Sequence, residues 1–170
     1  MYEGRYGNQE KFDVVISGGI KINDVYSNTV INLKGPEFET PVEMSPMLTK
    51  RSSSKSAVIG NEIYVLGGYD KSYSWTSSFE VYSSKEKCLK KLKSFSGHLN
   101  DHSVCSFMKG IYVIGGYFTV SDDYRRRNYD ICCYKYEVKF KKWTKVEKLQ
   151  IKRSSSACTV FEGKVVVTVD

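Results

Sequence analysis

The stretch NEIYVLGGYD, residues 61–70, runs four apolar or aromatic residues straight into a pair of glycines and then a tyrosine. The apolar run has the composition of a buried strand. The glycine pair at its end is not typical of a strand, because each glycine costs roughly 1 kcal/mol of backbone entropy relative to alanine. The pair therefore marks a position at which the fold needs a backbone without side chains.

The glycine pair recurs along the chain. Related stretches are KGIYVIGGYF at residues 109–118 and KFDVVISGGI at residues 11–20. In chain order, the pairs are Gly18 and Gly19, Gly67 and Gly68, and Gly115 and Gly116. Three copies at nearly constant spacing indicate an internal repeat of about 48 to 54 residues.

An arginine also recurs at a fixed distance from the glycine pair. Arg51 lies sixteen residues before the second pair, and Arg153 lies sixteen residues before Val169. Val169 and Asp170 therefore occupy the glycine positions of a fourth copy, while Leu99 takes the arginine position in the third. A large apolar residue lies four residues before each of these sites: Met47, Phe95 and Leu149.

Repeats of this length are typical of solenoids, propellers and arrays. Within one repeat, short apolar runs alternate with Gly, Asn, Asp and Ser, and no ten-residue window keeps a helical period. Four short strands in about 50 residues predict one four-stranded antiparallel sheet per repeat. The predicted repeats span residues of about 12–46 (without a first strand), 47–95, 96–149 and 150–170 (incomplete).

On these residues the chain resembles kelch repeats. The double glycine, the upstream arginine, and a tyrosine and tryptophan at Tyr136 and Trp143 carry the resemblance. It implies a β-propeller in which each repeat is one blade, similar to the kelch domain of BTB-kelch cullin-RING ubiquitin ligase adaptors, which usually has six blades. We therefore predict an all-β fold, with residues 1–170 forming a single partial propeller of about three blades.

The glycine pairs fit a packing role better than a ligand-binding role. Near the propeller axis the strands converge, and a glycine lets neighbouring backbones approach where a Cβ atom would clash. A phosphate-binding loop would need a following helix with a lysine and a serine or threonine, and no copy has this. About three blades would leave apolar blade faces uncovered, so we expect a fragment, a truncated product, or a ring completed by another chain.

Composition narrows the functional classes. The net charge of +7 is compatible with acidic partners. The sequence has no apolar run near 18 residues, no signal-peptide-like start and no Asn-x-Ser/Thr sequon, so we expect a cytoplasmic protein without a membrane partner. The cysteines Cys88, Cys105, Cys132, Cys133 and Cys158 are predicted to be reduced thiols in strands.

Catalytic residues are not evident in the sequence. Copper chemistry would need several histidine and tyrosine ligands, and the chain has two histidines, His98 and His102. We expect one to be solvated and the other to be hydrogen-bonded in a turn. No enzymatic activity, cofactor or metal is predicted.

Two loops are candidates for binding a partner, because loops on a rigid scaffold are free to vary. The first, residues 69–78, contains Tyr69, Tyr73 and Trp75. Tyrosine and tryptophan frequently contribute most of the energy of protein interfaces. The alternative is that Trp75 folds onto its own blade.

The second loop, residues 117–130, contains Tyr117 and the basic triplet Arg125, Arg126 and Arg127. Guanidinium groups suit bidentate recognition of carboxylate or phosphate. The alternative is that Asp122 and Asp123 neutralise the triplet within a solvated loop.

In kelch adaptor domains, the partner surface is built from the loops after the glycine pair and from residues beside the repeat arginine. By position, the resemblance implies Tyr69 and Tyr117 in the first group. In the second group it implies Ser52, Ser53, Ser154 and Ser155. Phosphorylation of the repeated KRSSS sequence is an alternative, but its fixed place in the repeat favours a structural origin.

The resemblance implies a protein-binding module that recognises the substrate of a cullin-RING ubiquitin ligase, through a peptide that is often acidic. The BTB and BACK regions that contact the cullin in that family are absent from these 170 residues. Alternatives are an actin-binding or cytoskeletal scaffold and a truncated competitor. Nucleic-acid binding through the basic segment KFKKWTK, residues 139–145, is disfavoured because no recognition motif accompanies it.

Overall fold

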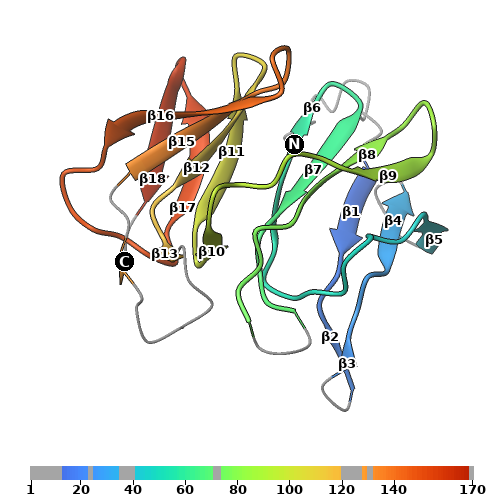
Figure 1. Cartoon of the computed structure of the whole chain (residues 1–170). Coiled ribbons are helices and arrows are strands. Elements are labelled where there is room, and N and C mark those ends of the chain that lie inside the picture. The colour runs from blue at the N-terminus through green and yellow to red at the C-terminus, as the bar shows by residue number, and fades with distance from the viewer. Residues whose placement is uncertain are drawn as a thin grey trace, which may run out of the picture.

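The computed structural model describes residues 13–22, 25–34, 41–70, 74–119, 128–129 and 132–168. These residues form strands, turns and loops without a helix, which confirms the all-β prediction. The same residues accordingly include no helix that could cross a membrane. Figure 1 shows the strands arranged as successive sheets along an arc.

Four antiparallel sheets follow one another in chain order, and we call them units 1 to 4. Unit 1 has the order β1-β4-β5: β1 (Asp13–Ser17), β4 (Val30–Lys34) and β5 (Pro41–Met44). Unit 2 has the order β6-β7-β8-β9: β6 (Lys55–Ile59), β7 (Glu62–Leu66), β8 (Phe79–Ser83) and β9 (Cys88–Lys91). Unit 3 has the order β11-β12-β15-β16: β11 (Ser103–Phe107), β12 (Gly110–Ile114), β15 (Cys132–Glu137) and β16 (Lys142–Lys148). Unit 4 is the hairpin β17 (Ala157–Phe161) and β18 (Lys164–Thr168).

Shorter strands lie beyond the ends of these sheets. β2 (Ile20–Lys21) pairs with β3 (Val25–Tyr26) after the glycine pair of unit 1. β13 (Tyr117–Thr119) pairs with both β10 (His98–Asn100) and β14 (Asn128–Tyr129) next to the glycine pair of unit 3. The loops after the glycine pairs therefore have regular backbone pairing of their own.

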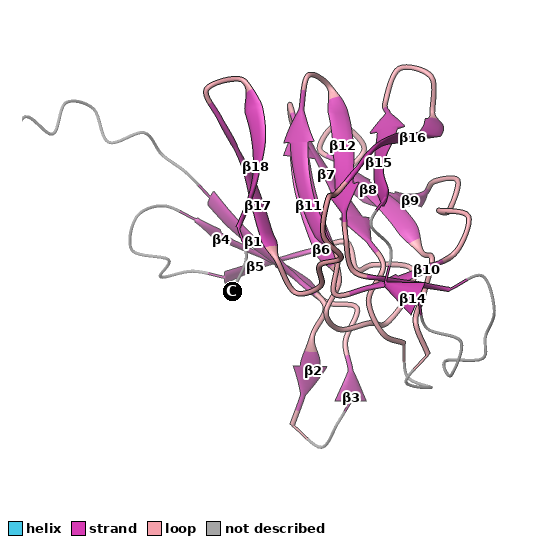
Figure 2. Ribbon diagram, turned by 90° about the vertical axis from the view of Figure 1, so that its left-hand side faces the viewer, coloured by secondary structure: helices cyan, strands magenta, loops and turns pink. Residues whose placement is uncertain are grey.

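The first strands of units 2, 3 and 4 lie next to one another. β6 contacts β11, and β11 contacts β17. Figure 2 shows β17 beside β11, with β12, β15 and β16 following on the other side of β11. This arrangement is a partial β-propeller of kelch type, as the repeat predicts.

Each gap between neighbouring sheets has its own apolar cluster. Unit 2 meets unit 3 through side chains including Leu66, Phe79, Ile111 and Tyr136, all almost completely buried. Phe79 and Tyr136 pack edge to face with ring centroids 4.8 Å apart, a favoured aromatic geometry. Val65, the neighbour of Leu66, points into the other gap and joins the cluster between units 1 and 2. β7 is thus covered on both faces, which explains its unbroken apolar sequence.

The tryptophan of the repeat closes the gap between units 2 and 3 from the outside. The ring of Trp143 lies 5.1 Å from that of Tyr136 and 5.2 Å from that of Phe95. Its indole nitrogen donates to the main-chain oxygen of Lys93 at 3.2 Å. Trp143 therefore joins its own unit to the segment that leaves unit 2.

The glycine pairs are the points at which one unit touches the next. A Cβ atom on Gly18 would lie 2.5 Å from the carbonyl oxygen of Arg51, and one on Gly115 would lie 2.6 Å from that of Arg153. Both glycines also have a positive φ, of 72° and 62°. The backbone therefore excludes a side chain here for two reasons, steric contact and conformation.

The second glycine of a pair donates a hydrogen bond across the same junction. The N–H of Gly19 donates to the Arg51 carbonyl at 3.0 Å, and the N–H of Gly116 donates to the Arg153 carbonyl at 2.6 Å. The carbonyl oxygen of the repeat arginine thus accepts a hydrogen bond from the glycine pair of the preceding unit. This contact repeats wherever an arginine opens the next unit in the described chain.

Alanine substitution at Gly115 should destabilise the protein more than alanine substitution at Gly60. Gly60 has a similar φ of 58° but open space around its Cβ position. Both variants incur the left-handed conformational cost of about 1–2 kcal/mol. Gly115→Ala should add roughly 1–3 kcal/mol from overpacking against the Arg153 carbonyl. Urea unfolding followed by tryptophan fluorescence measures the difference, and equal losses would show that Gly115 is not a packing contact.

Candidate functional site

The candidate site lies at the end of the sheets where the glycine pairs emerge. In unit 2, Tyr69 forms a two-way backbone pair with Ser52, with both N–H to O distances at 2.9 Å. Tyr69 also forms a bridge to Trp75. The loop after β7 is therefore held against the segment that follows the repeat arginine. These are the two segments in which the resemblance places the partner surface.

Arg51 anchors the serine segment through a buried ion pair. Its guanidinium lies 3.0 Å from a carboxylate oxygen of Glu80, and the two side chains are 0% and 1% exposed. Glu80 also accepts hydrogen bonds from the N–H of Leu48 at 2.7 Å and the hydroxyl of Ser78 at 3.1 Å. Burial lowers the pKa of Arg51, and the charge of Glu80 opposes this shift. Arg51 is thus placed to hold the backbone of its turn, and its charge does not reach solvent.

Unit 3 has uncharged side chains, Leu99 and Tyr134, at the two positions of the ion pair. Leu99 takes the arginine position and is 1% exposed. Val65 is paired with Glu80 in unit 2, and the equivalent Val113 is paired with Tyr134 in unit 3. The arginine and the glutamate are therefore lost together, as expected because either charge alone would be buried without compensation.

The turn after the repeat arginine presents its tip to solvent. Ser53, Asp101 and Ser155 occupy the same repeat position and have positive φ values of 54°, 51° and 53°. Ser53 and Ser155 are exposed, whereas Ser52 is buried and Ser154 is half-buried. The structure therefore places Ser53 and Ser155 where a partner could reach them.

The aromatic residues of the loops connect unit 2 to unit 3. Trp75 is 6% exposed, and its ring lies 5.7 Å from that of Tyr117. The Tyr69 hydroxyl accepts a hydrogen bond from the side-chain amide of Asn100 at 2.8 Å. Tyr69 and Tyr117 remain half-buried, so each keeps part of its surface accessible. Trp75 packs between the loops of units 2 and 3 and leaves little surface for a partner. The sequence predicts residues 69–78 as a loop in which burial is not required.

Four of the predicted partner residues lie outside the described part of the chain: Tyr73, Arg125, Arg126 and Arg127. Val169 and Asp170, which occupy the glycine positions of the fourth repeat, also lie outside it. The assignment of the basic triplet to a partner stays a prediction.

The sequence predicts one solvated and one hydrogen-bonded histidine, without assigning either role to His98 or His102. His98 is half-buried, and its Nδ1 contacts the main-chain oxygen of Trp75. His102 fits neither role, because its side chain is 0% exposed and neither ring nitrogen has a hydrogen-bond partner among the described residues. It fills the space opposite Gly67, where a Cβ atom would lie 2.6 Å from its ring carbon Cε1. Burial, assisted by the charge of Lys55, lowers the pKa of His102 to about 3. His102 is therefore neutral at physiological pH and occupies the junction between units 2 and 3.

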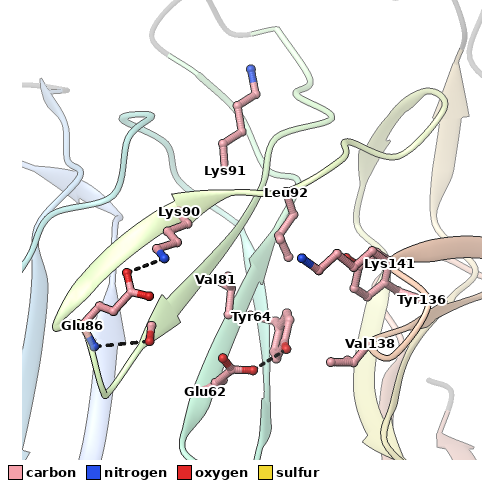
Figure 3. Close-up of a pocket in the computed structure, with 11 residues that line it drawn as sticks. Glu62, Tyr64, Val81, Glu86, Lys90, Lys91, Leu92, Tyr136, Val138 and Lys141 are labelled. Carbon is pink, nitrogen blue, oxygen red and sulfur yellow. Dashed lines mark hydrogen bonds and ion pairs between the residues drawn. The ribbon is translucent and has the colours of Figure 1, made fainter.

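A cavity lies at the end of the sheets opposite to the candidate site, near Glu62 at the start of β7 (Figure 3). It has a volume of about 380 Å³ and is lined by residues of units 2 and 3. In it, the Tyr64 hydroxyl donates to Glu62 at 2.7 Å, and burial together with this carboxylate raises the pKa of Tyr64. Because its pKa is raised, the Tyr64 hydroxyl stays protonated and is not an activated nucleophile. Within the described ranges, no group of three His, Cys, Asp or Glu side chains is arranged to hold a metal ion.

Sequence reasoning missed Asn100 and Asp101 as part of the same face. The signal was available, because they occupy the repeat positions of Ser52 and Ser53 in unit 2. This position is harder to recognise because Leu99 replaces the arginine that precedes the turn in the other two repeats. Main-chain contact confirms their place in the junction, since the N–H of Ser155 donates to the Asp101 carbonyl at 2.8 Å.

Comparison with known proteins gives a consistent result. A family model described as "Kelch motif" matches residues 50–93. The chain is similar to "Kelch repeat and BTB domain-containing protein 2" of ectromelia virus (strain Moscow), with 31% identity over 104 residues, 61% of this chain and 18% of the relative. It is also similar to the protein of the same name from cowpox virus (strain GRI-90 / Grishak), with 29% identity over 104 residues and the same coverage. The chain thus spans about a fifth of the length of these curated relatives.

The stability of the protein should fall as pH decreases from 6.5 towards 3, because the unfolded chain protonates His102 near 6.5 and the folded chain near 3. The slope from this group should approach about 1.4 kcal/mol per pH unit. His102→Ser, which restores the residue type at Ser54 and Ser156, should flatten the curve. Urea unfolding at a series of pH values gives both curves, and parallel curves would contradict the account.

Proposed function

The chain is a kelch-repeat protein that resembles BTB-kelch proteins, and we propose that it binds a short acidic segment of another protein. The binding face is formed by the loops after β7 and β12 and by the turns after the repeat arginine. It contains the accessible parts of Tyr69 and Tyr117 and the exposed Ser53 and Ser155. Recognition on this face requires no chemical step.

The observation that carries this proposal is the clamping of the loops at one end of the sheets. The Trp75–Tyr117 ring contact and the Asn100–Tyr69 hydrogen bond hold the loops of two units in one arrangement. A preorganised face loses less conformational entropy on binding than a mobile one. The clamp therefore turns two separate loops into one surface with fixed aromatic and hydroxyl groups.

Charge favours an acidic partner over a basic one. Exposed lysines flank the serine turns at Lys50, Lys55 and Lys152, and the chain as a whole carries a net charge of +7. Asp101 is on the same face and limits the positive potential around unit 3. Complementary charge speeds association and suppresses wrong partners more than it adds affinity.

The substrate of a cullin-RING ubiquitin ligase is the partner class that we propose. The relatives are named for a BTB domain as well as for kelch repeats. Where a kelch face and a BTB domain act together, the kelch face would select the substrate. We also propose that this activity is cytoplasmic, in a compartment where the thiols of Cys88, Cys105, Cys133 and Cys158 would stay reduced.

Actin is a second candidate partner, because its acidic surface would suit the positive charge of this chain. Cosedimentation with actin filaments separates the candidates. Actin binding that survives disruption of the serine turns would favour a cytoskeletal role on another face. A chain that binds a substrate without ligase recruitment would act as a competitor.

Aspartate at both serine tips should weaken binding to acidic peptides. Asp101 has the same φ as Ser53 and Ser155 within a few degrees, so Ser53→Asp and Ser155→Asp fit the backbone. Fluorescence anisotropy with a library of Asp- and Glu-rich peptides should give a dissociation constant about tenfold higher for the double variant, equivalent to about 1.4 kcal/mol.

The matched control is Ser84→Asp together with Lys85→Ala, in the turn between β8 and β9 at the far end of unit 2. Both residues are exposed and neither belongs to the proposed face. The control should leave peptide binding nearly unchanged. If the control weakens binding as much as the serine variants do, the interaction is a general charge effect and the proposed face is wrong.

A further inference from the structure

The junction between units 3 and 4 has a fixed register. The hydroxyl of Ser103 on β11 donates to the carbonyl oxygen of Ser156 at 2.6 Å, and the two hydroxyl oxygens are 2.7 Å apart. Both residues are buried. β11 and β17 lie side by side in Figure 2. This hydrogen-bonded contact sets which residues of the two first strands face each other.

Two residues beyond each serine, on β11 and β17, the register brings two cysteines together. Side chains two apart on a strand point to the same face. Cys105 follows Ser103, and Cys158 follows Ser156, at this spacing. Cys158 packs against the cluster that contains Cys105, and both cysteines line the same cavity. The two thiols influence each other, and this interaction lowers the pKa of Cys105 and raises that of Cys158.

The equivalent positions at the other junction are apolar. Ala57 of unit 2 corresponds to Cys105, and Val104 of unit 3 corresponds to Cys158. Ala57 and Val104 belong to the apolar contacts between units 2 and 3. Packing between first strands therefore does not require thiols, and the cysteine pair is a feature of the junction between units 3 and 4.

Solvent reaches the pair from one side. Cys105 and Cys158 line a cavity of about 390 Å³ together with residues of all three first strands, including Ser56, Ser106 and Thr159. Cys105 is 8% exposed and Cys158 is half-buried. A small hydrophilic oxidant can therefore enter, whereas a protein thiol cannot easily reach the buried sulfur.

We propose that Cys105 and Cys158 are a peroxide-sensitive thiol pair that closes into a disulfide between units 3 and 4. The oxidant class is a hydroperoxide, with hydrogen peroxide as the simplest member. This modification site is independent of the proposed peptide-binding face.

The reaction has two steps. The Cys105 thiolate attacks one oxygen of hydrogen peroxide, the O–O bond breaks, and the hydroxide that leaves takes up the thiol proton to form water. Cys105 is then a sulfenic acid, oxidised by two electrons. The sulfur of Cys158 attacks the sulfur of Cys105, the S–O bond breaks, and hydroxide leaves with the Cys158 proton as a second water. The lowered pKa of Cys105 suits it to the role of nucleophile, and its neighbour Cys158 is placed to be the resolving thiol.

The disulfide would fasten unit 4 to the rest of the arc. Unit 4 has two described strands, and an isolated two-stranded hairpin is marginally stable. Its contacts with unit 3 include the serine pair and the apolar cluster around Cys105 and Ile114. A covalent bond between β11 and β17 should therefore slow the opening of β17 and β18.

The test treats the full chain with hydrogen peroxide, blocks free thiols with N-ethylmaleimide and maps peptides by mass spectrometry. The dominant new species should be the peptide pair linked through Cys105 and Cys158. Because the folded chain holds the two sulfurs together, this disulfide should form at least about tenfold faster than in urea at the same pH and peroxide concentration. Hydrogen exchange in residues 157–168 should slow after oxidation.

Variants taken from the repeat itself provide the controls. Cys105→Ala copies Ala57, and Cys158→Ser copies Ser56, so both residues are already accommodated at these positions in unit 2. Either variant should abolish the disulfide, while Cys88→Ser should leave it intact. Cys133 is buried in the same cluster, so Cys133→Ser tests whether it is the true partner. Loss of the disulfide in Cys133→Ser, or equal rates in folded and unfolded chain, would overturn the proposal. So would full alkylation of Cys105 and Cys158 after oxidation, a result that requires no variant to fold.

Discussion

Contact between the glycine pair of one unit and the main chain that opens the next is the constraint on which this fold depends. The hydrogen bonds from Gly19 to Arg51 and from Gly116 to Arg153 join units whose sheets share no strand. A β-carbon on Gly18 or Gly115 would lie within 2.6 Å of the same carbonyl oxygen. The close approach brings the apolar faces of neighbouring sheets together, so burial of those faces follows from it.

The candidate binding face is a consequence of the same contact. The segment that accepts the glycine hydrogen bond continues directly into the exposed turn at Ser53 and Ser155. In units 2 and 3 the tyrosine after the glycine pair lies beside that turn, as the backbone pairs of Tyr69 with Ser52 and of Tyr117 with Asn100 show. A junction required for folding therefore also sets the spacing of the groups available to a partner. Loop sequences can change on this frame without a change in the position of their ends.

The fold could be predicted from the sequence because the residues that define the repeat are those that the backbone conformation requires. Glycine pairs, short apolar runs and turn residues are local features, and they predicted the all-β propeller units. Side-chain partners that lie far apart in the sequence were harder to predict, because they depend on which segments of the fold face each other. The pairing of Arg51 with Glu80, the burial of His102 and the packing of Trp75 against Tyr117 are all of this kind. Comparison of the repeats could have predicted one of these pairs, since Leu99 and Tyr134 together replace Arg51 and Glu80.

Amide hydrogen exchange at the glycine pairs tests the central claim most directly. If the junction hydrogen bonds hold the units together, the N–H groups of Gly19 and Gly116 should exchange as slowly as the amides in the middle of β7 and β12. They should also lose their protection together when the units separate in denaturant. Exchange of Gly19 and Gly116 at the rate of exposed loop amides, with β7 and β12 still protected, would contradict the account.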